Sequence, residues 1–177
     1  MKFIGNSSSI INWEELVSRL RTEEGRFRGS NQEDDIHENP KVAELRKTWQ
    51  AAGYEGNNAV GWVDYEVPEE IIAKFAEFVN AEPVGGWITS VPPGYCVPWH
   101  YDITDDEEQL LAQGQPLRFT CHISQAKFGQ VFVLEDHVFA NEAQGNVYQW
   151  SDWQQWHGGM NMGLEAKFLF NFIGFAK

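Results

Sequence analysis

The spacing of apolar residues divides the chain into two parts with different predicted structure. Up to about residue 82, apolar residues recur three or four positions apart, which is the period of an amphipathic helix. From about residue 58 onwards, apolar runs are short, alternate with polar residues and are separated by turn residues, as in strands. We therefore expect a single domain over residues 1–177, with a helical N-terminal part (about 1–82) and a strand-rich core (about 58–177).

Three helices are predicted in the N-terminal part. Asn12 is suited to cap the first, because its side chain can accept a hydrogen bond from the backbone of the first turn. Proline suits the start of a helix, so Pro40 and Pro68 predict where the other two begin. The predicted helices run over residues 13–21, from Pro40 to before Gly53, and from Pro68 to about Asn80.

Two polar and acidic stretches are predicted to be loops. Gly25 to Asn39 contains glycine, serine and asparagine around the run Glu33-Asp34-Asp35. The acidic run 105–108 is expected to be a solvated loop that also forms the lip of a site and disfavours anionic substrates. The sequence assigns no further role to the acidic stretches 31–38 and 105–108.

Short alternating segments predict the strands of the core, with turns between them at positions such as Gly158-Gly159. The predicted strands are Val60–Val67, Trp87–Val91, Tyr95–Ile103, Leu117–Ser124, Gln130–Leu134, His137–Ala140, Asn146–Trp150, Gln155–His157 and Lys167–Phe172. Many short strands at this spacing favour a sandwich or barrel. We expect a mainly β fold with flanking helices: a double-stranded β-helix (a cupin-like jelly roll) with the N-terminal helices packed outside.

Composition narrows the possible partners and the compartment. The formal net charge is −13, and an acidic surface repels phosphate backbones and anionic membranes, so neither nucleic acid nor membrane is an expected partner. No signal peptide or membrane-spanning run is evident, and Cys96 and Cys121 are too few for a disulfide framework. We expect a soluble cytoplasmic protein with free thiols.

Three residues have the spacing of a metal site. His100 and Asp102 are two positions apart in a predicted strand, so their side chains point to the same face and can bind one ion. His157, from a distant strand, would complete two histidines and one carboxylate, the facial arrangement of non-haem Fe(II) oxygenases. Open coordination positions in such a site accept O2 and a cosubstrate, so this arrangement favours an enzyme.

Two basic residues lie in predicted strands whose successive side chains point to opposite faces. Phe168, Phe170 and Phe172 share one face of the last predicted strand, which places Lys167 on the other face. A lysine in so apolar a strand is costly unless it pairs with an anion. Arg118 shares a face of its own strand with Thr120 and His122.

The residues around these positions follow a known order. Pro93 to Asp102 match the run "proline-glycine, several residues, proline-tryptophan-His-x-Asp", and Gly145 to Ile173 match "Gly-Asp, apolar run, His, Asn, basic residue, apolar strand", with Asn146 where Asp is common. The chain from about Trp87 to Phe175 thereby resembles the 2-oxoglutarate/Fe(II)-dependent oxygenase superfamily. Within it, the chain is most similar to the aspartyl/asparaginyl β-hydroxylase-like branch, including its small phage-type forms.

The resemblance implies a reaction and a role for each residue. His100, Asp102 and His157 would bind Fe(II), with 2-oxoglutarate and O2 as cosubstrates. The substrate would be hydroxylated while 2-oxoglutarate is decarboxylated to succinate and CO2. A basic residue about ten positions beyond the distal histidine, here Lys167, would pair with the far carboxylate of 2-oxoglutarate, and Arg118 would support it. The substrate class stays open between a protein side chain, an amino acid and a small metabolite, and so does the oligomeric state.

The sequence also permits other interpretations of the function and of some candidate residues. A cupin-like metal-binding or sugar-modifying protein would share the barrel without 2-oxoglutarate turnover, although cupin ligand sets more often include a glutamate. His122 is interpreted as structural. The stretch Trp150, Trp153 and Trp156 is either a substrate platform or core and rim packing, of which packing is the commoner use of such residues.

Overall fold

Strands dominate the computed structural model, which describes residues 1–29, 40–54, 59–102 and 107–177. The elements in chain order are β1 (Lys2–Asn6), η1 (Ser7–Ser9), α1 (Trp13–Leu20), β2 (Arg26–Gly29), α2 (Pro40–Ala51), β3 (Gly61–Tyr65), α3 (Glu69–Val79), β4 (Ala81–Val91), β5 (Cys96–His100), α4 (Glu107–Gln113), β6 (Leu117–His122), β7 (Gln130–Leu134), β8 (His137–Phe139), β9 (Asn146–Gln149), β10 (His157–Asn161) and β11 (Lys167–Ala176).

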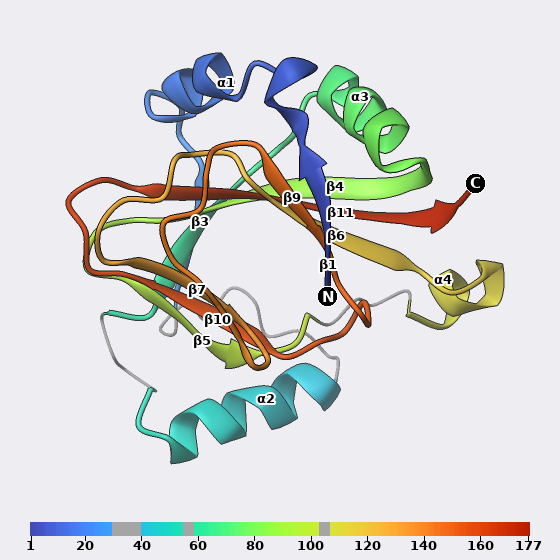
Figure 1. Ribbon diagram of the computed structural model, residues 1–177. Coiled ribbons are helices and arrows are strands. Elements are labelled where there is room, and N and C mark those ends of the chain that lie inside the picture. The colour runs from blue at the N-terminus through green and yellow to red at the C-terminus, as the bar shows by residue number, and fades with distance from the viewer. Residues whose placement is uncertain (30–39, 55–58, 103–106) are drawn as a thin grey trace.

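The strands form two sheets that face each other. The large sheet has the order β1-β9-β6-β11-β4-β3-β2, and the small sheet has the order β5-β10-β7-β8 (Figure 1). The long β11 lies at the centre of the large sheet, antiparallel to both β4 and β6. The predicted mainly β, jelly-roll fold with flanking helices is confirmed.

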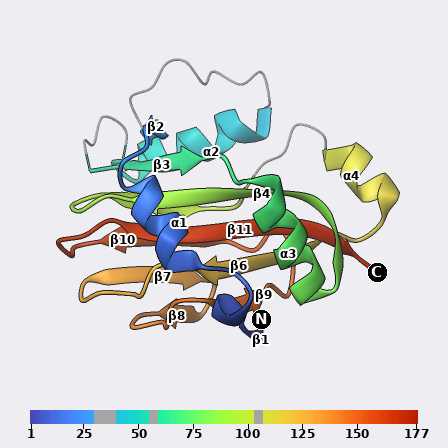
Figure 2. The ribbon, with the colours of Figure 1, turned by 90° about the horizontal axis from the view of Figure 1, so that it is seen from above.

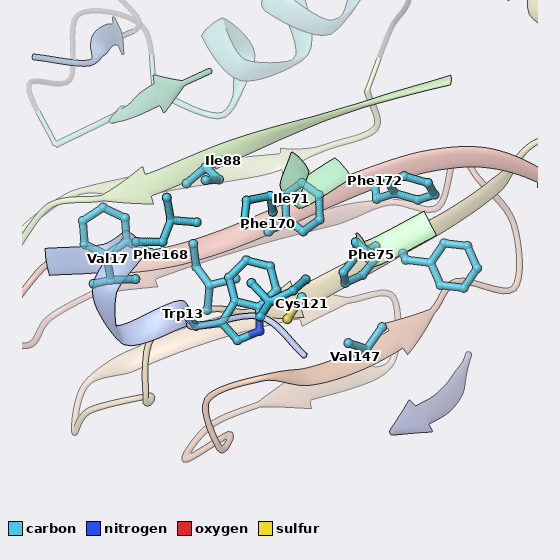
Figure 3. Close-up of a cluster of buried hydrophobic side chains, with 14 of the residues drawn as sticks. Trp13, Val17, Ile71, Phe75, Ile88, Cys121, Val147, Phe168, Phe170 and Phe172 are labelled. Atoms are coloured by element: carbon cyan, nitrogen blue, oxygen red, sulfur yellow. The ribbon is translucent and has the colours of Figure 1, made fainter. Parts of the chain in front are cut away.

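The outer face of the large sheet is covered by α1 and α3, which lie across β4, β11 and β6 when seen from above (Figure 2). Both helices have apolar faces that need a partner surface. Between them and the sheet lies the larger hydrophobic core, shown in Figure 3. Phe168, Phe170 and Phe172 of β11 all point into it, as their alternation predicts, and Phe75 of α3 packs against Phe170 with ring centroids 4.8 Å apart.

The opposite face of β11 points between the two sheets. Lys167, Leu169, Asn171 and Ile173 line a cavity there, which confirms the predicted division of the strand. A smaller apolar core closes one end of this space, and it comprises Phe132, Leu134, Phe139, Trp150 and Leu169. One strand therefore supplies both the main core and the wall of the cavity.

The three predicted helices are confirmed with small changes at their ends. The Asn12 side chain accepts a hydrogen bond from the Glu15 backbone N–H at 3.2 Å, so it caps α1 as expected. Asn80 ends α3 in the left-handed conformation, with φ of 54°, which asparagine tolerates better than most residues.

Within the described residues, no helix has both the length and the apolar character needed to span a membrane.

The N-terminal half contains more strand than predicted. Arg26–Gly29, part of the expected loop, forms β2 at the edge of the large sheet by pairing with β3. The remainder of that loop, 30–39, lies outside the described residues. β1 is not among the predicted strands, and β4 begins at Ala81 rather than at Trp87. Residues 81–86 join the strand through their pairing with the long β11.

Two predictions in the C-terminal half are wrong. Gly158-Gly159 is not a turn but the interior of β10, which begins at His157. A Cβ at Gly159 would lie 3.0 Å from the Val131 carbonyl oxygen, so glycine is used here for close strand approach. Of the acidic run 105–108, Glu107 and Glu108 begin α4, where acids favour the first turn, and 105–106 lie outside the described residues.

The first test concerns the main core. Phe75 is fully buried among Trp13, Phe119 and the β11 phenylalanines. We expect Phe75→Ala to lower the free energy of unfolding by about 3–5 kcal/mol, because it removes a buried ring and leaves a cavity. Urea denaturation measures the change. Phe128→Ala is the control, since Phe128 is 95% exposed, and its effect should stay within about 0.5 kcal/mol. Equal losses in both variants would contradict this account of the core.

Candidate metal centre

A cavity of about 860 Å³ lies between the two sheets and reaches α2. The inner faces of β4, β6 and β11 form one wall, and β5 and β10 form the other. All five residues that the sequence singled out line this cavity: His100, Asp102, Arg118, His157 and Lys167. Residues from four separate parts of the chain therefore meet in one space.

Strand pairing brings the two histidines together. β5 and β10 are antiparallel neighbours, and His157 lies directly opposite His100 in their register. The two ring centroids are 4.2 Å apart. His100 ends β5 and His157 begins β10, so both imidazoles lie at the same end of the small sheet. Asp102 follows two residues after His100, as the H-x-D spacing requires.

Backbone hydrogen bonds fix the orientation of both rings. Nδ1 of His100 lies 2.7 Å from the Pro98 carbonyl oxygen, and Nδ1 of His157 lies 3.0 Å from the Gln155 carbonyl oxygen. A carbonyl only accepts, so each Nδ1 carries the proton and donates it, which leaves each Nε2 with a free lone pair. Metal-binding histidines use this arrangement, with the second nitrogen bonded to a backbone carbonyl.

The three candidate ligand atoms converge on one point. Asp102 Oδ1 lies 3.3 Å from His100 Nε2 and 3.7 Å from His157 Nε2, and all three atoms lie within 4.8 Å of one another. Bonds of about 2.1 Å at right angles would separate ligand atoms by about 3 Å. The donor set therefore fits a divalent transition metal on one face, with the other face directed into the cavity.

The electrostatics keep these groups in their ligating forms. Burial, and then the neighbouring His100, lowers the pKa of His157 well below its usual value, so the ring is neutral. Burial would raise the pKa of Asp102, but Arg118, followed by the two histidines, outweighs it and holds that pKa well below its usual value. Asp102 is thus ionised although only 34% of its side chain is exposed.

Arg118 has a different partner from the one expected. Its guanidinium forms an ion pair with Asp102 Oδ2, the carboxylate oxygen that turns away from the histidines. The guanidinium also lies 3.7 Å from the centre of the Trp150 ring and donates a hydrogen bond to the Trp153 carbonyl oxygen at 3.3 Å. Arg118 is almost fully buried, so this pair is held in place by packing on every side.

Lys167 lies in the same cavity and is only 3% exposed. Its Nζ is 5.3 Å from the centre of the Phe132 ring, and the described residues place no carboxylate within ion-pairing distance of it. Burial lowers the pKa of Lys167 to about 7. A buried amine with this pKa is only partly charged at neutral pH, and an anion in the cavity would favour its charged form.

Other predicted residues take structural places. His122 packs among Phe132, Phe139 and Tyr148 without lining the cavity, and its Nε2 is buried with no hydrogen-bond partner among the described residues. Trp150 and Trp153 are buried and Trp156 is half-buried, so the tryptophan stretch serves both core and rim. Both cysteines are free; Cys121 is buried and Cys96 is half-buried.

Sequence reasoning missed the contribution of the N-terminal half to this cavity. Trp49 of α2 lies edge-on to the His100 ring, with centroids 6.0 Å apart, and donates a hydrogen bond from Nε1 to the Trp99 carbonyl oxygen. Asp64 of β3 lines the cavity and accepts a hydrogen bond from Thr89 at 3.3 Å. Nothing in the local pattern around Trp49 or Asp64 distinguishes them from surface residues, because only the tertiary fold places them here.

Comparison with known proteins identifies similar solved structures but no family. No family model matches the chain, and no curated protein matches it. A Pseudomonas putida prolyl-4-hydroxylase is 13% identical, with a TM-score of 0.47 over 93% of this chain and 100% of that one. The viral collagen prolyl hydroxylase of Paramecium Bursaria Chlorella virus-1, solved with 2OG, is 11% identical, with a TM-score of 0.46 over 99% and 96%. A Thermotoga maritima protein described as a predicted oxalate decarboxylase is 13% identical, with a TM-score of 0.39 over 65% and 81%.

The second test uses the buried histidine beside the site. Burial, and then Lys167, lowers the pKa of His122 from 6.5 to about 3. The unfolded chain binds a proton below pH 6.5 that the folded chain does not, so His122 reduces stability as the pH falls from 6.5 towards 3. The loss is about 1.4 kcal/mol for each pH unit.

We expect His122→Phe to flatten the dependence of unfolding free energy on pH by about that slope, measured by urea denaturation at several pH values. Phenylalanine suits the site, because its neighbours are aromatic rings. An unchanged slope in the variant would show that His122 is protonated normally in the folded protein.

Proposed function

We propose that this protein is a 2-oxoglutarate- and Fe(II)-dependent oxygenase that hydroxylates its substrate. One observation supports this most directly: the cavity that holds two histidines and a carboxylate also holds a buried lysine with no carboxylate partner among the described residues. A metal site alone would need no such lysine. A metal chelated by an anionic cosubstrate would, because the free carboxylate of that cosubstrate needs a buried cation.

His100, Asp102 and His157 are the proposed ligands of the metal. When bound, Fe(II) would supply the oxidising chemistry, with its open positions available to the keto acid and O2. Each imidazole is oriented by the bond from its Nδ1 to a backbone carbonyl, of Pro98 or Gln155, which directs Nε2 towards the proposed metal position.

Lys167 is the proposed partner of the far carboxylate of 2-oxoglutarate. Lys167 lies beside Phe132 and Leu169, so a charge-assisted bond formed there is partly shielded from water and strong. With a pKa near 7, the Lys167 amine is partly unprotonated at neutral pH and takes up a proton as the anion binds, so binding and protonation are coupled.

Arg118 is proposed to position Asp102 rather than the cosubstrate. Its ion pair engages Oδ2 and leaves Oδ1 directed at the histidines, so Asp102 can bind the metal through one oxygen. This is a change from the sequence-based expectation, in which Arg118 supported 2-oxoglutarate.

Within the superfamily, the motif order supports the aspartyl/asparaginyl β-hydroxylase-like branch, with residues 1–177 as one catalytic domain. A cupin-like protein without 2-oxoglutarate turnover is the alternative. The two functions differ in one measurable property. With Fe(II), ascorbate and O2, the proposed oxygenase converts 2-oxoglutarate to succinate slowly even without its substrate, whereas the alternative releases no succinate and does not bind 2-oxoglutarate.

The third test addresses the metal. We expect His100→Ala and Asp102→Ala each to abolish Fe(II) binding, measured by anaerobic calorimetry, and to abolish the slow release of succinate. His137→Ala is the control, because His137 lies on β8 with its side chain exposed and outside the cavity. Circular dichroism checks that each variant is folded. Full Fe(II) occupancy in both site variants would disprove the assignment.

The fourth test separates the two cations. Lys167→Ala should weaken 2-oxoglutarate binding ten- to a hundredfold, because a charge-assisted bond contributes about 1.5–3 kcal/mol, and should leave Fe(II) affinity unchanged. Arg118→Gln should instead weaken Fe(II) binding roughly ten- to a hundredfold, as loss of a group that orients a ligand does. Calorimetric titrations with each ligand measure both.

The pH dependence of the same titration gives an independent check. The pKa of Lys167 is about 7 in the free protein, so wild-type affinity for 2-oxoglutarate should fall as the pH rises above 7, while the Lys167→Ala variant should show no such fall. If Arg118→Gln proves to be the variant that loses 2-oxoglutarate, the roles of the two cations must be exchanged.

A further inference from the structure

An aromatic groove lies next to the metal centre, on the outer side of the small sheet. Its lining consists of Thr48, Trp49, Ala52, Tyr54, Trp99, Glu135 and Trp156. Trp49 and Tyr54 also line the large cavity, so the groove and the cavity adjoin. We call this surface the aromatic groove.

The strand pairing that builds the metal centre also builds this groove. Trp99 and Trp156 each directly precede a proposed ligand, His100 and His157, and those two histidines are opposite one another in the β5–β10 register. Side chains alternate along a strand, so the histidines point into the cavity and the tryptophans point away from it. The two indoles lie nearly parallel, with an interplanar angle of 19° and centroids 6.4 Å apart.

The packing of α2 leaves Trp99 exposed and Trp49 and Trp156 half-buried. α2 has no buried side chain, and besides Trp49 it contributes the small residue Thr48 to the groove, followed by Ala52 just beyond the end of the helix. Trp99 remains 43% exposed. Large exposed aromatic rings grouped around a groove are characteristic of binding surfaces.

A carboxylate shares the groove with the aromatic rings. Glu135 Oε2 accepts a hydrogen bond from Gln155 Nε2 at 2.7 Å, and the Glu135 backbone N–H donates to the Trp156 carbonyl oxygen at 2.9 Å. These bonds fix a negative charge beside Trp156.

Indole faces together with a carboxylate favour a positive charge. The negative face of an aromatic ring attracts an ammonium or guanidinium, and tryptophan does so most strongly. The chain's net charge of −13 adds a long-range attraction for the same kind of ligand. An uncharged apolar occupant would gain nothing from Glu135 and would leave its carboxylate partly desolvated.

We propose that the aromatic groove binds an arginine or lysine side chain of a peptide substrate, next to the residue that enters the metal cavity. This rests on the proposed oxygenase function, and it selects a peptide or protein substrate over a free small metabolite. The metal cavity takes the reacting residue, and the adjoining groove takes its cationic neighbour.

Binding of a small cationic probe tests the groove without any metal or cosubstrate. The probe is Nα-acetyl-L-arginine amide, titrated into the metal-free protein, and the indole N–H signals of Trp49, Trp99 and Trp156 are followed by NMR. We expect weak, saturable binding that shifts these signals. Nα-acetyl-L-citrulline amide, which has nearly the same shape but no charge, should not shift them.

Two variants and two controls locate the binding. Glu135→Gln and Trp99→Leu should each weaken arginine amide binding roughly three- to thirtyfold. Glu77 is an exposed residue of α3 and Phe128 is an exposed loop residue, so Glu77→Gln and Phe128→Leu should leave arginine amide binding unchanged. Glu135→Gln should keep wild-type Fe(II) affinity, which shows that the metal centre is intact in that variant.

The possible outcomes separate this proposal from the oxygenase function. Equal binding of the citrulline amide, absence of binding, or binding unaffected by Glu135→Gln would each overturn the cationic groove. If the arginine probe binds as expected but the protein neither binds 2-oxoglutarate nor releases succinate, the groove stands and the proposed oxygenase function fails.

Discussion

The alternation of side chains along β11 is the constraint on which the rest of the structure depends. The strand is central in the large sheet, so its two faces meet two different environments. Its phenylalanines complete the core beneath α1 and α3, and Lys167 and Asn171 face the cavity. A shift of one residue in its register would exchange the two sets, placing an amine in the core and phenyl rings in the cavity. The apolar core therefore fixes where the amine lies.

The candidate metal centre depends on a second pairing, between β5 and β10. That register sets the distance between the two imidazoles, and Arg118 sets the orientation of the carboxylate between them. A buried ion pair contributes little net stability, because desolvation of the two charges offsets their attraction. Its value here lies in geometry, since Arg118 is surrounded by Trp87, Trp150 and the Trp153 backbone and has no alternative position.

Sequence reasoning found the parts of the site that local patterns encode. Alternation placed Lys167 and Arg118 on the correct strand faces. Asp102 does lie beside His100, but β5 ends at His100, so the predicted shared strand face is not what brings the two together. The partner of Arg118 could not be predicted, because it depends on how β6 lies relative to the end of β5. Trp49 was missed because its contact with His100 exists only in the tertiary fold. Gly158-Gly159 was misread because glycine marks turns and close strand contacts alike.

The weak attachment of α2 has a consequence for how substrates reach the cavity. Its described contacts include the Trp49 hydrogen bond to Trp99 and the ion pair of Lys41 with Glu107, and none of its side chains is buried. Unfolding α2 would expose little additional apolar surface, so its free energy of local opening is small compared with that of β11. Amide hydrogens of α2 should exchange with solvent through this local opening, whereas those of central β11 exchange only when the whole protein unfolds. The part of the cavity that α2 lines is therefore expected to open locally while the barrel stays folded, which would give a ligand access.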